Sequence, residues 1–167
     1  SCRYSFQQLG VGQGLDSGRR GHKGQASASE VWGLPVQEYL KRADVWPLNP
    51  VGEIMLGIKI ENRRALENAE SSAKVPGPIY GEWGAGDMAM SFGYPDAHDP
   101  PYPEAVSQAR ERVKAALQEA NVFFLDLVFL DTVVEMIDEG LMIGSTGPAG
   151  EAPAKIGRAH TKRTMPV

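Results

Sequence analysis

Residues 56–61 read LGIKIE and residues 79–87 read IYGEWGAGD, and these two stretches decide the fold of the chain. Each apolar run is short and bounded by turn residues, which is typical of a buried strand. Between them, residues 62–74 predict a helix with Asn62 as its N-cap and a stripe of alanine and leucine on one face. This order predicts two parallel strands joined by a right-handed connection.

An acidic residue follows each of these strands: Glu61 after the first, and Asp87 in the glycine-rich turn after the second. The carboxyl ends of parallel strands form the working face of α/β sheets and barrels, so we expect both carboxylates on that face. Gly84 and Gly86 allow close approach of the backbone, and two carboxylates there suit Mg²⁺ or Mn²⁺. From spacing alone, Glu61 pairing with an arginine and Asp87 capping a turn are alternative interpretations.

Strands and helices continue to alternate downstream of Asp87. The predicted elements are a helix over 104–120, a strand over 122–127, a helix over 132–139 with Asp131 as N-cap and Gly140 at its end, a strand over 141–145, and a terminal helix within 147–159 weakened by two prolines. Such alternation predicts an α/β fold with a parallel sheet. Four β/α units make half of a (β/α)8 barrel, so the residues indicate either a small open α/β domain or a half-barrel.

The first 50 residues differ in character from the rest. Residues 10–24 contain six glycines and predict a loop, either a linker or a backbone-rich ligand-binding loop. A short helix is expected after Pro35, and the sequence WPLNP at 46–50 predicts a rigid connector. We therefore expect residues 1–50 to form a glycine-rich and helical lead-in, and residues 51–167 to form the β/α units.

Composition narrows the class of protein. The chain has 167 residues, a net charge of −4 and 42% hydrophobic residues, as expected for about one globular domain. It has no long basic run, so we expect no nucleic-acid partner. Its most apolar run, at 122–130, is interrupted by Asp126 and is too short to span a bilayer, so we expect no membrane partner. A single cysteine, Cys2, fits a cytoplasmic setting without disulfides.

Several motifs resemble the HpcH/HpaI aldolase family of metal-dependent 2-oxo-acid aldolases, which has citrate lyase β-type relatives. The resemblance rests on GIKIEN at 57–62, ALENAE at 65–70, VPG at 75–77, GAGDMAMSFG at 84–93, GRRG at 18–21, QEYLKRA at 37–43 and IDEGLMIG at 137–144. It covers nearly the whole chain. It implies a (β/α)8 TIM-type barrel of which this chain is the C-terminal half, strands five to eight.

The resemblance also implies roles for particular residues. Glu61 and Asp87 would hold the divalent metal, Mg²⁺ or Mn²⁺, and backbone groups of Gly84, Ala85 and Gly86 would bind the carboxylate of a small pyruvate-type 2-oxo acid. The implied reaction is cleavage of 4-hydroxy-2-oxo acids to pyruvate and an aldehyde, with the metal as a Lewis acid that stabilises the leaving enolate. The enzyme would be a carbon–carbon lyase, and relatives of this kind form homo-oligomers.

The chain departs from the family pattern at two site positions. Lys59 stands where many relatives have Gln, and Ala85 replaces the usual Pro. Lys59 precedes Glu61 by two residues, so both should point to the same side of the strand. Lys59 is therefore a further catalytic candidate, and Arg20 of the GRRG motif is another.

The proton-transfer groups of the family come from the first half of its barrel. The three histidines here do not match them (His22, His98 and His160). Two alternatives therefore stand beside the aldolase: a citryl- or malyl-CoA lyase relative, and a truncated, non-catalytic metal-binding remnant. A flavodoxin-like domain is disfavoured because no phosphate-binding loop follows any strand.

Overall fold

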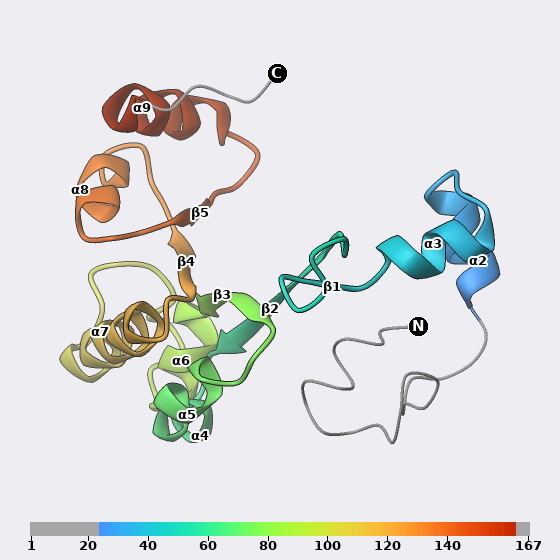
Figure 1. The fold of residues 1–167 in the computed structure, drawn as a ribbon. Helices are drawn as coiled ribbons and strands as arrows, with labels where there is room; N and C mark the ends of the chain where they lie inside the picture. The colour runs from blue at the N-terminus through green and yellow to red at the C-terminus, as the bar shows by residue number, and fades with distance from the viewer. Residues whose placement is uncertain (1–23, 163–167) are drawn as a thin grey trace. The chain divides into compact units, whose positions relative to one another are not determined.

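The structure is a computed structural model that describes residues 24–162 (Figure 1). Its elements in chain order are α2 Gln25–Val31, α3 Val36–Arg42, β1 Val45–Trp46, β2 Ile54–Ile60, α4 Arg63–Glu67, α5 Ala69–Ala73, β3 Pro78–Trp83, α6 Ala85–Ser91, α7 Glu104–Glu119, β4 Phe123–Leu127, α8 Val133–Asp138, β5 Ile143–Ser145 and α9 Glu151–Thr161. Arg20 and most of the glycine-rich loop lie outside the described residues. No helix within residues 24–162 has both the length and the apolar character needed to cross a bilayer.

The strands follow the order β1-β2-β3-β4-β5 in one sheet. β1 pairs in parallel with β2, β3 with β4, and β4 with β5, and in the last two pairs Tyr80 lies opposite Phe123 and Leu125 opposite Ile143. At least one helix separates each strand from the next between β2 and β5. This confirms the predicted α/β class with a parallel sheet.

The chain divides into two compact units, one of Ser1–Gly57 with Val75–Ile79 and the other of Ile58–Lys74 with Tyr80–Val167. Lys59, Glu61, Asp87 and the glycine turn all belong to the second unit. The predicted division of the chain at residue 50 stays a prediction.

The first unit contains a short strand that the sequence did not predict. β1 has only two residues, and it begins beside Asp44, whose buried carboxylate accepts hydrogen bonds from Val45 N at 2.8 Å and Asn49 Nδ2 at 3.2 Å. Where a rigid connector was expected over 46–50, the chain therefore turns around an aspartate. Upstream, α2 and α3 pack together, and Trp32 meets Tyr39 edge to face at 5.3 Å.

The core of the second unit lies on one face of its strands. α7 buries its whole apolar stripe there (Val106, Ala109, Val113, Ala116 and Leu117). Phe124 of β4 is fully buried on this face. The neighbouring positions Phe123 and Leu127 point the other way and are 41% and 44% exposed, because side chains alternate along a strand. In this unit the sheet thus has one covered face and one face that is exposed at Phe123 and Leu127, which we call the bare face.

The helix predicted over 62–74 is two helices. Asn62 is the N-cap as predicted, and its Oδ1 accepts a hydrogen bond from Ala65 N at 2.9 Å. The break comes at Asn68, whose Nδ2 donates to the carbonyl of Arg64 at 2.8 Å while its backbone leaves the helical region. Asparagine side chains compete with the helix ladder in this way, so α4 ends and α5 begins at this residue.

Two helix starts near the C-terminus also differ from prediction. The N-cap of α8 is Thr132, so the prediction of Asp131 as cap was wrong by one residue. α9 forms a full helix from Glu151 despite its internal proline. Pro153 lies in its first turn, where the backbone N–H needs no partner within the helix, so the proline costs little there.

Candidate functional site

Glu61 and the glycine turn that leads into Asp87 lie against each other. Glu61 follows β2 directly, and Asp87 lies in the first turn of α6, the short helix after β3. A Cβ atom built on Gly84 would lie 2.7 Å from Glu61 Oε2 and 2.8 Å from Glu61 Cβ. The backbone at Gly84 therefore passes directly against the Glu61 side chain, and only glycine fits at this position.

Lys59 lies beside the same carboxylate. Its Nζ is 2.8 Å from Glu61 Oε2 and 3.8 Å from Glu82 Oε1. The close contact with Glu61 is the main cause that raises the pKa of Lys59, and the charges of Glu82 and Asp87 act in the same direction. Three carboxylates thus stabilise the charged form of the Lys59 ammonium group.

The Oε2 atom of Glu61 has an unusual environment. It is buried and accepts no aligned hydrogen bond from the described residues, although the Lys59 ammonium lies 2.8 Å from it as an ion pair. A buried carboxylate oxygen needs a cation or a hydrogen-bond donor, and among the described residues the Lys59 ammonium is the cation beside it.

The donor set around this oxygen is compatible with Mg²⁺ or Mn²⁺. The donors are hard carboxylate oxygens, Gly84 contributes no side chain that would fill the space, and Mg²⁺ is commonly bound by one or two protein carboxylates with water and substrate. Within residues 24–162 there is no group of three or more His, Cys, Asp or Glu residues that could hold a metal ion. The fit is therefore to an ion that two carboxylates share with non-protein ligands.

The predicted carboxylate-binding turn, Gly84 to Gly86, is the start of α6. Gly84 is the N-cap with extended backbone and provides no side-chain hydrogen bond, so it leaves N–H groups of the first turn uncapped. Ala85, in place of the usual proline, is buried. A Cβ atom on Gly86 would lie 3.1 Å from His98 Cβ, so the His98 loop packs against this turn.

Two residues near this site were not among the predicted site residues. Glu82 was missed although a charged side chain within the apolar strand IYGEW is a recognisable signal. His98 was dismissed because it matches no family histidine, and its position against Gly86 comes from a loop that no periodicity describes. Its Nδ1 lies 3.1 Å from Asp99 Oδ2, and both side chains are exposed.

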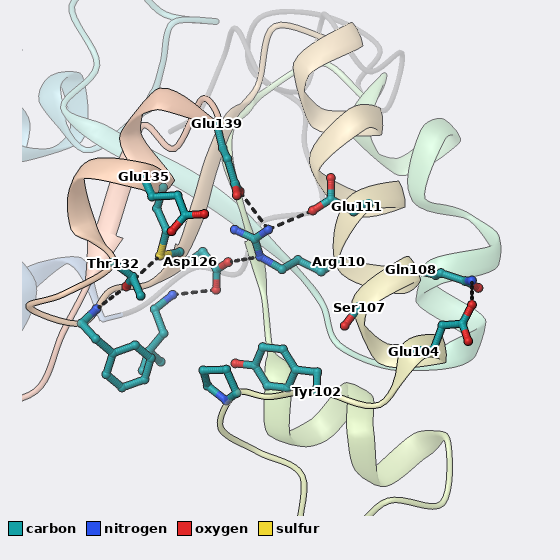
Figure 2. A pocket seen from close by; sticks show the side chains of 14 residues that line it. Tyr102, Glu104, Ser107, Gln108, Arg110, Glu111, Asp126, Thr132, Glu135 and Glu139 are labelled. Atoms are coloured by element: carbon teal, nitrogen blue, oxygen red, sulfur yellow. Dashed lines mark hydrogen bonds and ion pairs between the residues drawn. The ribbon is translucent and has the colours of Figure 1, made fainter.

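A cavity of about 630 Å³ lies elsewhere in the second unit, between α7, β4 and α8 (Figure 2). Arg110 crosses it: Nε lies 2.7 Å from Asp126 Oδ2, and Nη1 lies 2.9 Å from Glu111 Oε1 and 3.1 Å from Glu139 Oε2. Burial raises the pKa of Asp126, and the ion pair with Arg110 opposes this rise. None of the predicted site residues lines this cavity.

Comparisons with known proteins agree with the sequence motifs. No family model matches the chain. A 2-keto-3-deoxy-L-rhamnonate aldolase of Klebsiella pneumoniae is 32% identical over 111 residues, which are 65% of this chain and 38% of that protein.

Two solved structures have a similar fold. An HpcH/HpaI aldolase/citrate lyase family protein from Burkholderia cenocepacia superposes with a TM-score of 0.61 at 21% identity, covering 87% of this chain and 52% of that chain. Protein CitE from Mycobacterium tuberculosis, in complex with magnesium, acetoacetate and coenzyme A, gives 0.52 at 16% identity, covering 86% and 59%.

The chain thus spans less than half of the curated relative and little more than half of these solved structures. Its structural neighbours are TIM-barrel-type aldolases, which confirms the predicted fold, with coverage of only part of each barrel. The chain is therefore similar, over part of their length, to a curated 2-keto-3-deoxy-L-rhamnonate aldolase and to HpcH/HpaI aldolase/citrate lyase structures, which agrees with the resemblance that its motifs carry.

Proposed function

We propose that this chain is the metal-binding half of a class II aldolase that cleaves 4-hydroxy-2-oxo acids to pyruvate and an aldehyde. The observation that carries the proposal is the buried Oε2 atom of Glu61, which accepts no hydrogen bond from the described residues and lies against the side-chain-free position of Gly84. The aldolase relatives support the reaction class.

Under this proposal, each residue of the site has one task. Glu61 and Asp87 would hold Mg²⁺ or Mn²⁺, which when bound supplies Lewis-acid polarisation of a carbonyl oxygen. The backbone N–H groups at the start of α6, from Gly84 to Gly86, would orient the substrate carboxylate. Lys59 would keep the excess negative charge of the site low enough for an anionic substrate to enter.

The proposal assigns proton transfer to groups outside this chain. The base and the substrate-binding arginine of the family belong to the other half of the barrel, and the bare sheet face at Phe123 and Leu127 is where such a half would pack. We therefore expect turnover only when both halves are present. A small 2-oxo acid as partner, the homo-oligomer and the cytoplasmic setting are part of the same proposal.

Metal titration of the whole chain tests the proposal. In calorimetry with MnCl₂, Glu61→Gln and Asp87→Asn should each weaken binding by about tenfold or more, because each removes one of two charged ligands. Glu119→Gln removes the same charge from an exposed pair with Lys74 and should leave binding within about twofold of wild type.

Circular dichroism and thermal melts of the same variants would show that the fold is intact. Binding that is equal in wild type, both site variants and the Glu119 control would overturn the assignment of the metal to Glu61 and Asp87.

A further inference from the structure

The carboxylates assigned to the metal already have a cation beside them. Lys59 Nζ lies 2.8 Å from Glu61 Oε2, the same oxygen that accepts no hydrogen bond. An ammonium group and a divalent cation cannot both occupy the space in front of one carboxylate oxygen, because like charges at such short separation repel strongly. A metal that binds Glu61 must therefore displace the lysine from this position.

We propose that Lys59 is a tethered counter-cation, which neutralises Glu61 in the metal-free protein and competes with the divalent cation for it. The inference rests on the proposed function in one respect, the assignment of Glu61 as a metal ligand. It goes further because it predicts that Lys59 weakens metal binding, whereas a ligand or supporting residue would strengthen it.

Glu82 supplies the place to which the lysine would move. Its Oε1 is 3.8 Å from Lys59 Nζ, on the neighbouring strand β3, so a change of side-chain rotamer is enough to transfer the ammonium group. The Lys59 side chain is 51% exposed, which leaves it free to change rotamer. Four-carbon lysine side chains adopt such alternative positions readily.

The charges of the cluster would balance only with the divalent cation bound. Three carboxylates and one ammonium group leave a net charge of −2 in the metal-free site. A divalent cation on Glu61 and Asp87, with Lys59 on Glu82, would bring the cluster to neutrality. Each negative group would then have one positive partner, which is favourable in a partly buried site.

The first experiment removes the competing charge. In MnCl₂ calorimetry at low ionic strength, Lys59→Gln should bind Mn²⁺ about two- to fivefold more tightly than wild type, the range expected for losing one half-exposed ion pair. Lys59→Arg keeps the charge and should remain as weak as wild type.

Lys74→Gln is the matched control for the overall charge. Lys74 forms an ion pair of similar length with Glu119 at 3.0 Å and is 59% exposed. Its replacement should change the affinity by less than about 1.5-fold, since Lys74 pairs with Glu119 and not with Glu61 or Glu82. Affinity for Mn²⁺ that is unchanged or weaker in Lys59→Gln than in Lys74→Gln would overturn the inference.

The second experiment tests the role of Glu82 with a double-mutant cycle. If Glu82 acts by receiving Lys59, Glu82→Gln should weaken Mn²⁺ binding a few-fold in the wild-type background and by about twofold or less in the Lys59→Gln background. A loss of about tenfold or more in both backgrounds would make Glu82 a metal ligand and overturn its role as the receiving group.

The two proposals can fail separately. If Glu61→Gln abolishes Mn²⁺ binding but Lys59→Gln leaves it unchanged, the metal site stands and the counter-cation is overturned. If neither the wild type nor the folded Lys59→Gln variant binds Mn²⁺, the metal site itself is overturned. The proposed role of Lys59 as counter-cation is then overturned with it.

Discussion

The second unit contains two charged clusters that differ in how completely their charges are paired. Around Arg110, one guanidinium group reaches three carboxylates, and Asp126 accepts further hydrogen bonding from Leu127 N at 2.7 Å. Around Lys59, one ammonium group faces three carboxylates, and an oxygen of Glu61 stays without a hydrogen bond from the described residues. In a network that only stabilises the fold, each buried polar atom usually has a hydrogen-bond partner. A buried carboxylate oxygen without a hydrogen bond is instead a candidate for ligand binding.

Geometry explains the contrast. Arginine presents a planar fork of five donors and can satisfy several carboxylates at once, while lysine is a point charge on a long stem. The Arg110 and Asp126 side chains are 14% and 4% exposed, so their pairing is shielded from water. The side chain of Lys59 is half exposed, and its pairing is easily exchanged. The first cluster fixes α7 against β4, and the second is the one that we propose as the site of an exchangeable ion.

Breaking the Arg110 network should have the largest effect on stability. Arg110→Met leaves Asp126 buried without its partner, and it should cost about 3–5 kcal/mol in the free energy of unfolding. Arg112→Met is the matched control, because Arg112 forms its ion pair with Glu70 on the surface and should cost less than about 1 kcal/mol. Urea unfolding of both variants measures the difference. Equal losses of unfolding free energy in the two variants would show that the Arg110 network stabilises the fold no more than a surface ion pair does.

Adding one methyl group at Gly84 should act on the other cluster. Gly84→Ala places its Cβ 2.7 Å from Glu61 Oε2, so the carboxylate must move. We expect a loss of about 1–3 kcal/mol in stability from overpacking and a weakening of Mn²⁺ binding by about tenfold. Gly147→Ala meets no atom within 4 Å and is the control. If Gly84→Ala binds Mn²⁺ as tightly as the Gly147→Ala control, Glu61 is not part of the metal site.

The smallest effect is expected from a surface pair, through its pH dependence. The side-chain hydrogen bond from Arg112 is the main cause that lowers the pKa of Glu70 from 4.5 to about 2. Because the folded pKa lies below the unfolded value, this stabilisation is complete above pH 4.5 and is lost as the pH falls toward 2. Glu70→Gln should make the unfolding free energy slightly less dependent on pH in this window. Added salt should reduce this difference between wild type and Glu70→Gln. If the plots of unfolding free energy against pH coincide at low salt, the Glu70–Arg112 pair does not contribute to stability.

The parts of the fold that depend on residues close together in the sequence could be predicted. Asn62 caps α4 because its side chain reaches a backbone N–H three residues away. The break at Asn68 was missed because asparagine is tolerated within helices, and only its bond to Arg64 O ends this one. β1 was missed because two residues carry no periodicity.

The candidate site was predictable in part for the same reason. Lys59 was placed near Glu61 by the two-residue period of a strand, and the structure puts the two 2.8 Å apart. Glu82 lies on the neighbouring strand, and its approach to Lys59 depends on how β2 and β3 are aligned, which a single sequence does not specify. The Arg110–Asp126 pair joins a helix to a strand 16 residues later and was invisible for the same reason.

The bare face of the sheet has a consequence for every measurement on this chain. Phe123 and Leu127 offer water a strip of apolar side chains that parallel sheets normally cover. Whatever covers this strip adds its own binding free energy to the folded state by mass action. If a second copy of the chain covers this strip, the melting temperature should rise with the protein concentration.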